Sequence, residues 1–409
     1  MAVGLSIATP VVAQDPLVEL HGMLELGVAG RVRADPLQPD DLVLGEARFR
    51  LDLSHFTDRA EFFFKGDLTT DAVADDVELD IRQAVVLLRA TDWLDVRVGR
   101  QVLTWGTGDL LFLNDQFPKD FVSFFIGRDD EFLKAPSNSM KVTAYTGLAN
   151  VDLVWTPVFE PDRFITGERI SFFDTSGGSL VSAKTTGGPL QPLKPAREFE
   201  NGELAARVFR VVGGYELAAY GYWGFTKQPL AFDPVAERAM YSRQSVYGAS
   251  VRGGWLGGIA NFEGALYDSS DGGGANPNVP NSEVRALLGY ERELATDLTA
   301  GFQYSLEWVL DHGALLANSR NPRFEPRETT HMLTNRVTYR LMQQTLTLSL
   351  FTFVVPADDD AHVRASATKR WSDAMTITVG ANVMTGDDSG FFGQLEKASN
   401  AFLRIRYGF

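Results

Sequence analysis

The feature that most limits how this chain can fold is an alternation of apolar and polar residues that recurs along most of its length. In the segment 297–308, every second residue from Leu298 to Trp308 is apolar, and polar or small residues lie between them. The segments 374–383 and 403–409 repeat the pattern. A period of two is typical of a β-strand whose two faces meet different surroundings.

We count eighteen such segments, and no stretch with helical periodicity interrupts them. They span residues 17–33, 43–53, 59–70, 77–89, 92–104, 139–146, 149–157, 203–213, 214–225, 243–255, 257–267, 283–293, 297–308, 328–341, 344–355, 360–371, 374–384 and 397–409.

The connections between the segments alternate in length. Short turns lie at 90–91, 147–148, 213–214, 256–257, 295–296, 343 and 372–373, and long loops at 105–138, 158–202, 226–242, 268–282, 309–327 and 385–396. Outer-membrane barrels have short periplasmic turns and long extracellular loops. We therefore predict an all-β fold, a single transmembrane antiparallel β-barrel of about 18 strands over residues 14–409, located in the bacterial outer membrane.

Composition removes several other classes of protein. The chain has no cysteine, which excludes a disulfide framework, a thiolate-held iron–sulfur cluster and a zinc ribbon. Its 53 acidic residues outnumber 38 Lys and Arg, which argues against nucleic-acid binding. It has no apolar run long enough for a transmembrane helix. The polar faces carry charged residues in strand after strand, as a water-filled lumen requires.

The two ends of the chain are consistent with export. Residues 2–13 are apolar or small and predict the remnant of a signal peptide, 1–13, cleaved after Ala13; an apolar N-terminal strand or helix is the alternative. The final strand ends in Phe409, which resembles the C-terminal signal that the barrel-assembly machinery recognises. All seven tryptophans lie near predicted strand ends, as in the aromatic girdles of membrane barrels.

One motif carries a family resemblance. The stretch 98–106 reads Val-Gly-Arg-Gln-Val-Leu-Thr-Trp-Gly and continues into Asp109, Asp115, Pro118 and Asp120. It resembles the Gly-Arg-Gln motif of the alginate-export outer-membrane porin family and of related Gly-Arg-Gln/Trp-Gly barrels. The resemblance implies a monomeric eighteen-stranded channel, and the motif covers only about residues 96–120.

The predicted lumen face is rich in arginine. Guanidinium groups bind carboxylates and stay charged, so these residues favour anionic solutes, although acidic neighbours on the same face could pair with them instead. The candidate pore-lining residues are Arg48, Arg50, Arg97, Arg100, Arg336, Arg340, Arg364, Arg404 and Arg406. Arg100 breaks the alternation. A bulge at Gly99 would turn its side chain inward, and a position near the outer rim would instead relieve the cost of facing lipid; we predict the bulge and an inward Arg100.

Two of the long loops have distinctive compositions, one apolar and the other rich in glycine and proline. Loop 105–138 is too apolar to lie in water, so we expect it to fold into the lumen as a constriction; a hydrophobic cap on the outer surface is the alternative. Loop 158–202 is rich in glycine and proline and could act as a lid. The charged residues expected to define the constriction are Asp109, Asp115, Lys119, Asp120 and Arg128.

These features together predict a channel for diffusion or export of small polar, anionic solutes or acidic saccharides. The alternatives are a barrel enzyme, for which none of the five histidines lies in a nucleophile motif, and a structural or adhesive barrel. We expect no catalytic residue, cofactor or metal site and no nucleic-acid partner. The expected partners are outer-membrane lipid and lipopolysaccharide.

Overall fold

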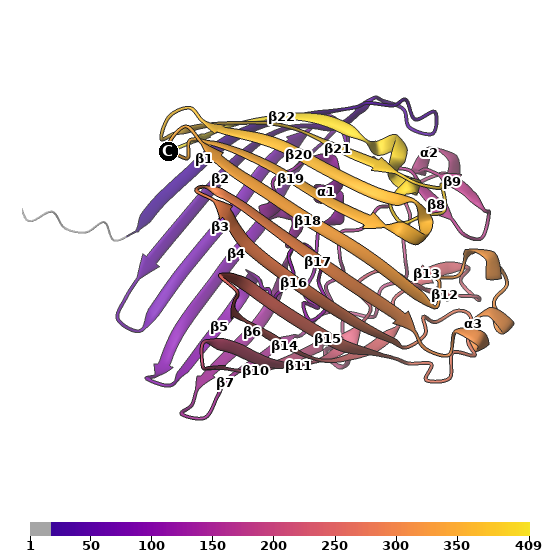
Figure 1. The fold of residues 1–409 in the computed structure, drawn as a ribbon, viewed down its shortest axis with the longest axis horizontal. Helices are drawn as coiled ribbons and strands as arrows, with labels where there is room; N and C mark the ends of the chain where they lie inside the picture. The colour runs from indigo at the N-terminus through magenta and orange to yellow at the C-terminus, as the bar shows by residue number, and fades with distance from the viewer. Residues whose placement is uncertain (1–17) are drawn as a thin grey trace, which may run out of the picture.

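A computed structural model describes residues 18–409, so the predicted signal segment, 1–13, lies outside the described residues. Eighteen strands form one antiparallel sheet, which closes where the last strand pairs with the first (Figure 1). This confirms the predicted barrel, and each of the predicted segments corresponds to one strand. The barrel strands are β1 (Glu19–Arg31), β2 (Leu42–Phe56), β3 (Ala60–Asp71), β4 (Asp76–Thr91), β5 (Leu94–Val102), β6 (Pro136–Tyr145), β7 (Asn150–Thr156), β10 (Glu203–Val212), β11 (Tyr215–Phe225), β14 (Arg243–Trp255), β15 (Gly258–Ser269), β16 (Glu283–Ala295), β17 (Leu298–Val309), β18 (Thr329–Leu341), β19 (Leu346–Val355), β20 (Asp360–Arg370), β21 (Met375–Thr385) and β22 (Asn400–Gly408).

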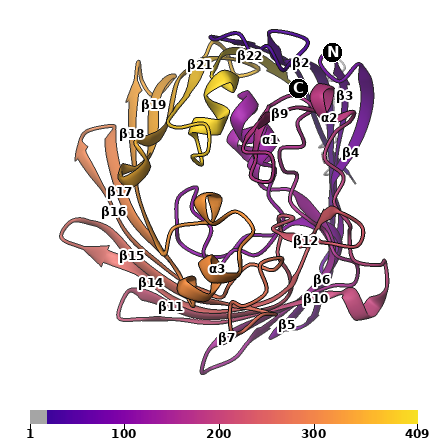
Figure 2. The same ribbon diagram turned by 90° about the vertical axis from the view of Figure 1, so that its right-hand side faces the viewer.

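The long loops gather at one end of the barrel and contain the remaining elements (Figures 1 and 2). Among the described residues, no helix has the length and apolar character needed to cross a membrane. The loop elements are α1 (Phe121–Ile126), η1 (Asp130–Leu133), β8 (Phe172–Asp174), β9 (Ser179–Val181), α2 (Ala183–Thr186), η2 (Phe199–Asn201), β12 (Ala231–Asp233), β13 (Arg238–Met240), α3 (His312–Asn318), η3 (Pro322–Phe324), η4 (Pro356–Asp358) and η5 (Gly393–Ala398).

The two faces of the barrel wall reverse the arrangement of a soluble protein. On β1, Leu24 and Leu26 are more than half exposed on the outer face, whereas Glu25 between them is buried inside. On β2, Phe49 is exposed between the buried Arg48 and Arg50. An apolar band outside and a polar face inside fit a barrel whose outer wall contacts lipid.

Six of the seven tryptophans follow the predicted girdles. Trp93, Trp255 and Trp371 are exposed at the short-turn end, and Trp155, Trp223 and Trp308 are exposed near the long loops. Trp105 departs from the prediction. It is buried inside the barrel against Phe117 and Tyr220, because the chain has already left β5 and turned into the lumen.

A hydrophobic core lies inside the outer half of the barrel. Phe124, Phe125 and Ile126 of α1 pack against inward-facing side chains of β19–β22, including Phe353 and Phe402. On these strands the inner face is therefore partly apolar. The core holds α1 against one side of the wall.

Candidate functional site

The loop between β5 and β6, residues 103–135, enters the barrel and contacts opposite parts of its inner wall; we call it the inner loop. Figure 2, viewed from the long-loop end, shows α1 within the ring of strands. Residues 107–114 of the inner loop contact β15, β17 and β18, and residues 128–134 contact β20, β22, β2 and β4. The chain thus crosses the lumen.

A single buried carboxylate holds the first part of the inner loop. Glu263 on β15 is 1% exposed and accepts hydrogen bonds from the backbone N–H of Thr107, from that of Gly108 at 2.9 Å and from the Asn114 side chain at 2.9 Å. Gly106, at a φ of 80°, provides the left-handed turn that brings these donors to Glu263. Sequence reasoning did not single out Glu263, although it lies at an inward position of a predicted strand.

Asp109 anchors the same part of the inner loop to β17 and β18. Its carboxylate forms a bidentate ion pair with Arg336 on β18, at 2.5 and 3.0 Å. Its backbone N–H donates to Gln303 on β17 at 2.7 Å, and its carbonyl accepts from the same side chain at 2.8 Å. Arg336, predicted to face the solute, therefore holds a residue of the predicted constriction.

The acidic segment 129–131 lies against the arginines of the other wall. Asp129 pairs with Arg404 at 3.1 Å and with Arg406 at 3.5 Å. Burial raises the pKa of Asp129, but the two guanidinium groups outweigh it, and the net pKa is below the usual value. Its carboxylate is consequently ionised at neutral pH.

The next two acidic residues continue this contact with the wall. Asp130 pairs with Arg364 at 2.9 Å, and Glu131 pairs with Arg50 at 2.8 Å. Most of the arginines predicted to form an anion-selective wall are thus paired with carboxylates. The partners come mainly from the inner loop, which the period-two pattern of the strands does not include.

Phe132 adds an aromatic contact that the sequence did not reveal. Its ring lies 4.2 Å from the guanidinium carbon of Arg48, 5.2 Å from that of Arg50 and 4.9 Å from that of Arg82. Arg82 also donates to the carbonyls of Glu131 and Lys134. Cation–π contacts of this kind stabilise by about 0.5–2 kcal/mol each, so the arginines also fix the position of the loop through its ring.

The other predicted constriction residues serve the internal structure of the inner loop. Asp115 and Lys119 form a buried ion pair at 3.0 Å. Asp120 caps α1 by accepting the backbone N–H of Ser123 at 2.8 Å. Arg128 pairs with Glu46 of β2. Of the five predicted residues, Asp109 is the one placed at the open edge of the loop, with its side chain 45% exposed.

The loop between β7 and β10, residues 157–202, is attached to the inner loop. Asp162 accepts the backbone N–H of Lys119 at 2.7 Å, and Arg163 pairs with Asp80 on β4 at 2.9 Å. Burial raises the pKa of Asp162 to about 6, an effect that the charge of Lys119 opposes only in part. The lid role predicted for 158–202 stays a prediction; in this structure the loop braces the inner loop.

The bulge predicted at Gly99 is wrong. The pairing of β5 with β4 and with β6 continues through Gly99 and Arg100 without a shift in register. Arg100 stays on the outer face, the face of the exposed Val98. The energetic cost of a charged side chain on that face is relieved because Arg100 lies near the long-loop end. Its guanidinium donates to the carbonyl of Ile81 at 2.6 Å and lies 3.6 Å from Glu160. It does not line the pore.

No carboxylate within residues 18–409 pairs with the inward-facing Arg97, Arg252, Arg340 or Arg370. Arg97 lies 5.9 Å from the Phe63 ring. Arg340, on the list of predicted residues, and Arg252 on β14 are exposed, with neither an ion pair nor a side-chain hydrogen bond to the described part of the chain. Arg252 and Arg340 lie toward the short-turn end, below the inner loop. We call these two residues the open arginines.

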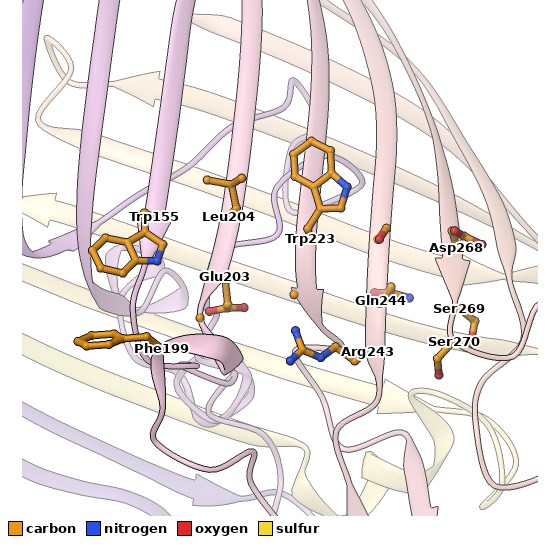
Figure 3. A pocket seen from close by; sticks show the side chains of 13 residues that line it. Trp155, Phe199, Glu203, Leu204, Trp223, Arg243, Gln244, Asp268, Ser269 and Ser270 are labelled. Atoms are coloured by element: carbon orange, nitrogen blue, oxygen red, sulfur yellow. The ribbon is translucent and has the colours of Figure 1, made fainter.

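A groove of about 570 Å³ lies elsewhere, on the outside of the barrel near the long loops (Figure 3). Trp155, Leu204 and Trp223 point outward from β7, β10 and β11, and Phe199 and Arg243 lie beside them. This groove belongs to the aromatic girdle.

Comparisons with known proteins agree with the fold. No family model matches the chain, and no curated protein matches it. Two solved outer-membrane proteins are similar in structure. OccAB1 of Acinetobacter baumannii has a TM-score of 0.56 at 8% identity, with 96% of each chain covered. OccK2 (OpdF) of Pseudomonas aeruginosa, solved in complex with glucuronate, has a TM-score of 0.55 at 12% identity, with 96% of this chain and 97% of that chain covered.

The likeness at this identity concerns the fold: a closed outer-membrane β-barrel of the porin type. The apolar outer band and the two girdles of tryptophan place the barrel in a bilayer, and single-chain bacterial barrels of this kind reside in the outer membrane. The specific resemblance to the alginate-export family stays a prediction.

Proposed function

We propose that this protein is an outer-membrane channel for small polar solutes, with a preference for solutes that carry a carboxylate. The observation that supports this most is the inner loop, which narrows a barrel of eighteen strands and is fixed to opposite walls by Glu263, Asp109 and the segment 129–131. A barrel of this strand number encloses an aqueous lumen, and an ordered loop within it limits the size of the solute.

The carboxylate preference rests on the open arginines. Arg252 and Arg340 lie on the wall below the inner loop, where Arg336 already holds the carboxylate of Asp109. The guanidinium groups of Arg252 and Arg340, which form no ion pair with the described part of the chain, would be available on this wall to bind the carboxylate of a solute. The glucuronate complex of OccK2 supports the same chemistry in a barrel of similar fold. Small organic acids and acidic saccharides, the predicted solutes, both fit it.

A planar-bilayer experiment tests the channel itself. Purified folded protein is expected to give discrete conductance steps, and a variant with residues 107–114 replaced by a short glycine linker is expected to give larger steps. Heat-modifiable migration on gels shows that each variant is folded. Folded protein that conducts neither with the intact nor with the shortened loop would contradict the proposal.

The ion preference is tested by reversal potentials in a salt gradient. The double variant Arg252→Gln/Arg340→Gln is expected to shift the reversal potential toward cations, because both open guanidinium charges are lost. Arg59→Gln, in the turn between β2 and β3, is the control for a charge removed outside the barrel wall. Equal reversal potentials in all three proteins would remove the support for a carboxylate preference.

A further inference from the structure

A cleft below the inner loop brings together charged groups of opposite sign on one wall. Its lining includes Asp109 from the inner loop, Arg252 from β14, Glu291 from β16 and Arg336 from β18. The cleft lies toward the short-turn end, so a solute entering from the outside reaches it after passing the inner loop.

Two of these charges are already neutralised. Arg336 and Asp109 form a bidentate ion pair, and the guanidinium of Arg336 also lies 4.6 Å from the Phe351 ring. The nearby amides are used as well: Gln303 bonds the backbone of Asp109, and Asn261 donates to Thr107. These groups hold the inner loop in place.

The other two charges have no partner. Arg252 and Glu291 are exposed, and within residues 18–409 neither side chain forms an ion pair or a hydrogen bond. The cleft therefore presents one free cation and one free anion, and its four charges sum to zero.

The strand register fixes how far apart the free charges are. Arg252 pairs with Asn261 and Glu291 pairs with Ile259, so the two residues lie on either side of β15 and two positions apart along it. With strands about 4.8 Å apart and a rise of about 3.4 Å per residue, their Cα atoms are about 12 Å apart. Both long side chains can point into the space between them.

This space matches a small zwitterion. The amino nitrogen and a carboxylate oxygen of an α-amino acid are about 3 Å apart, and a hydrogen bond of about 3 Å at each end gives a span of about 9 Å. The guanidinium of Arg252 would bind the carboxylate, and the carboxylate of Glu291 would bind the ammonium group. A simple anion would meet Glu291 as a like charge.

We propose that Arg252 and Glu291 form a subsite for small zwitterionic solutes, such as neutral amino acids and short peptides. The inference rests on the proposed channel function and narrows its carboxylate-bearing solutes to those that also carry an ammonium group. The side chain of Ile259, inward-facing and 40% exposed, supplies an apolar surface beside the subsite.

L-alanine and L-lactate are the matched probes, because they differ mainly in an ammonium group replaced by a hydroxyl. In liposome-swelling assays, the wild-type protein is expected to pass alanine several-fold faster than lactate, with glycerol as the uncharged reference. Glu291→Gln is expected to abolish the difference between alanine and lactate. Arg252→Gln is expected to slow both relative to glycerol.

Glu198→Gln, on the exposed surface of the 157–202 loop, is the control and is expected to behave as the wild type. Equal rates for alanine and lactate in the wild type, or a preference unchanged in Glu291→Gln, would overturn the subsite while leaving the channel intact. If glycerol also fails to pass and folded protein gives no conductance, the channel proposal fails instead.

Discussion

Glu263 accepts three hydrogen bonds from the first part of the inner loop. Glu263→Ala would leave the backbone N–H groups of Thr107 and Gly108 and the Asn114 amide without their acceptor. Each lost bond to a charged group destabilises by about 1.5–3 kcal/mol. We expect a loop that fluctuates, which single-channel recordings would detect as increased open-channel noise and a higher mean conductance.

Glu263→Gln keeps an acceptor of the same shape and is expected to restore part of the quiet wild-type current. Glu237→Ala, on the exposed tip of the 226–242 loop, is the matched control for loss of a carboxylate. Recordings of Glu263→Ala that are as quiet as the wild type would show that other contacts are sufficient to hold the loop.

Asp162 couples two elements, the 157–202 loop and the inner loop, in a pH-dependent way. Its pKa in the folded protein, about 6, is above the usual 3.8, because burial penalises the charged form. As the pH rises from about 4 to 6, the unfolded chain ionises this group more readily than the folded chain does, so stability falls. The difference between the two pKa values corresponds to roughly 3 kcal/mol, lost in full above pH 6.

Asp162→Asn removes this cost and keeps an oxygen that can accept the Lys119 N–H. Its melting temperature, followed by circular dichroism in detergent, is expected to exceed that of the wild type at pH 7.5 and to approach it at pH 4. Identical pH profiles for the two proteins would show that Asp162 is ionised without penalty.

At the scale of the whole molecule, the barrel depends on the closure between β1 and β22. Phe409 and Gly22 exchange backbone hydrogen bonds at 2.9 and 3.0 Å, and the Phe409 ring stacks on Phe49. A Cβ on residue 22 would lie 2.5 Å from the Phe409 ring, so glycine leaves the space that this ring fills.

Phe409→Ala is expected to lower the fraction of folded barrel in cell envelopes, measured by heat-modifiable migration, because the ring both packs at the closure and carries the predicted assembly signal. Phe391→Ala, an exposed aromatic in the loop before β22, controls for general loss of apolar surface. Refolding of Phe409→Ala in detergent separates the two roles, since detergent contains no assembly machinery. Wild-type folding in both settings would contradict both.

The sequence predicted the strands well and the partners of the side chains poorly. Alternation is a local property, so each strand and its inward set, such as Arg48 and Arg50, could be found from neighbours alone. The pairing of Arg404 with Asp129 joins residues far apart in the chain, and no periodicity reports it. Arg100 was misplaced because a bulge and a position near the rim both satisfy an arginine that breaks the pattern.

The acidic segment 129–131 is, in effect, a ligand permanently attached to its own receptor. Tethering gives its carboxylates an effective concentration on the order of millimolar at least, so a dilute free carboxylate cannot compete for Arg364, Arg404 and Arg406. These arginines stay paired with the carboxylates of segment 129–131, whichever solute passes through the channel. The shape of the aperture beside the inner loop is therefore independent of the solute concentration. Uptake should rise in proportion to the external solute concentration, with no change in the barrel wall.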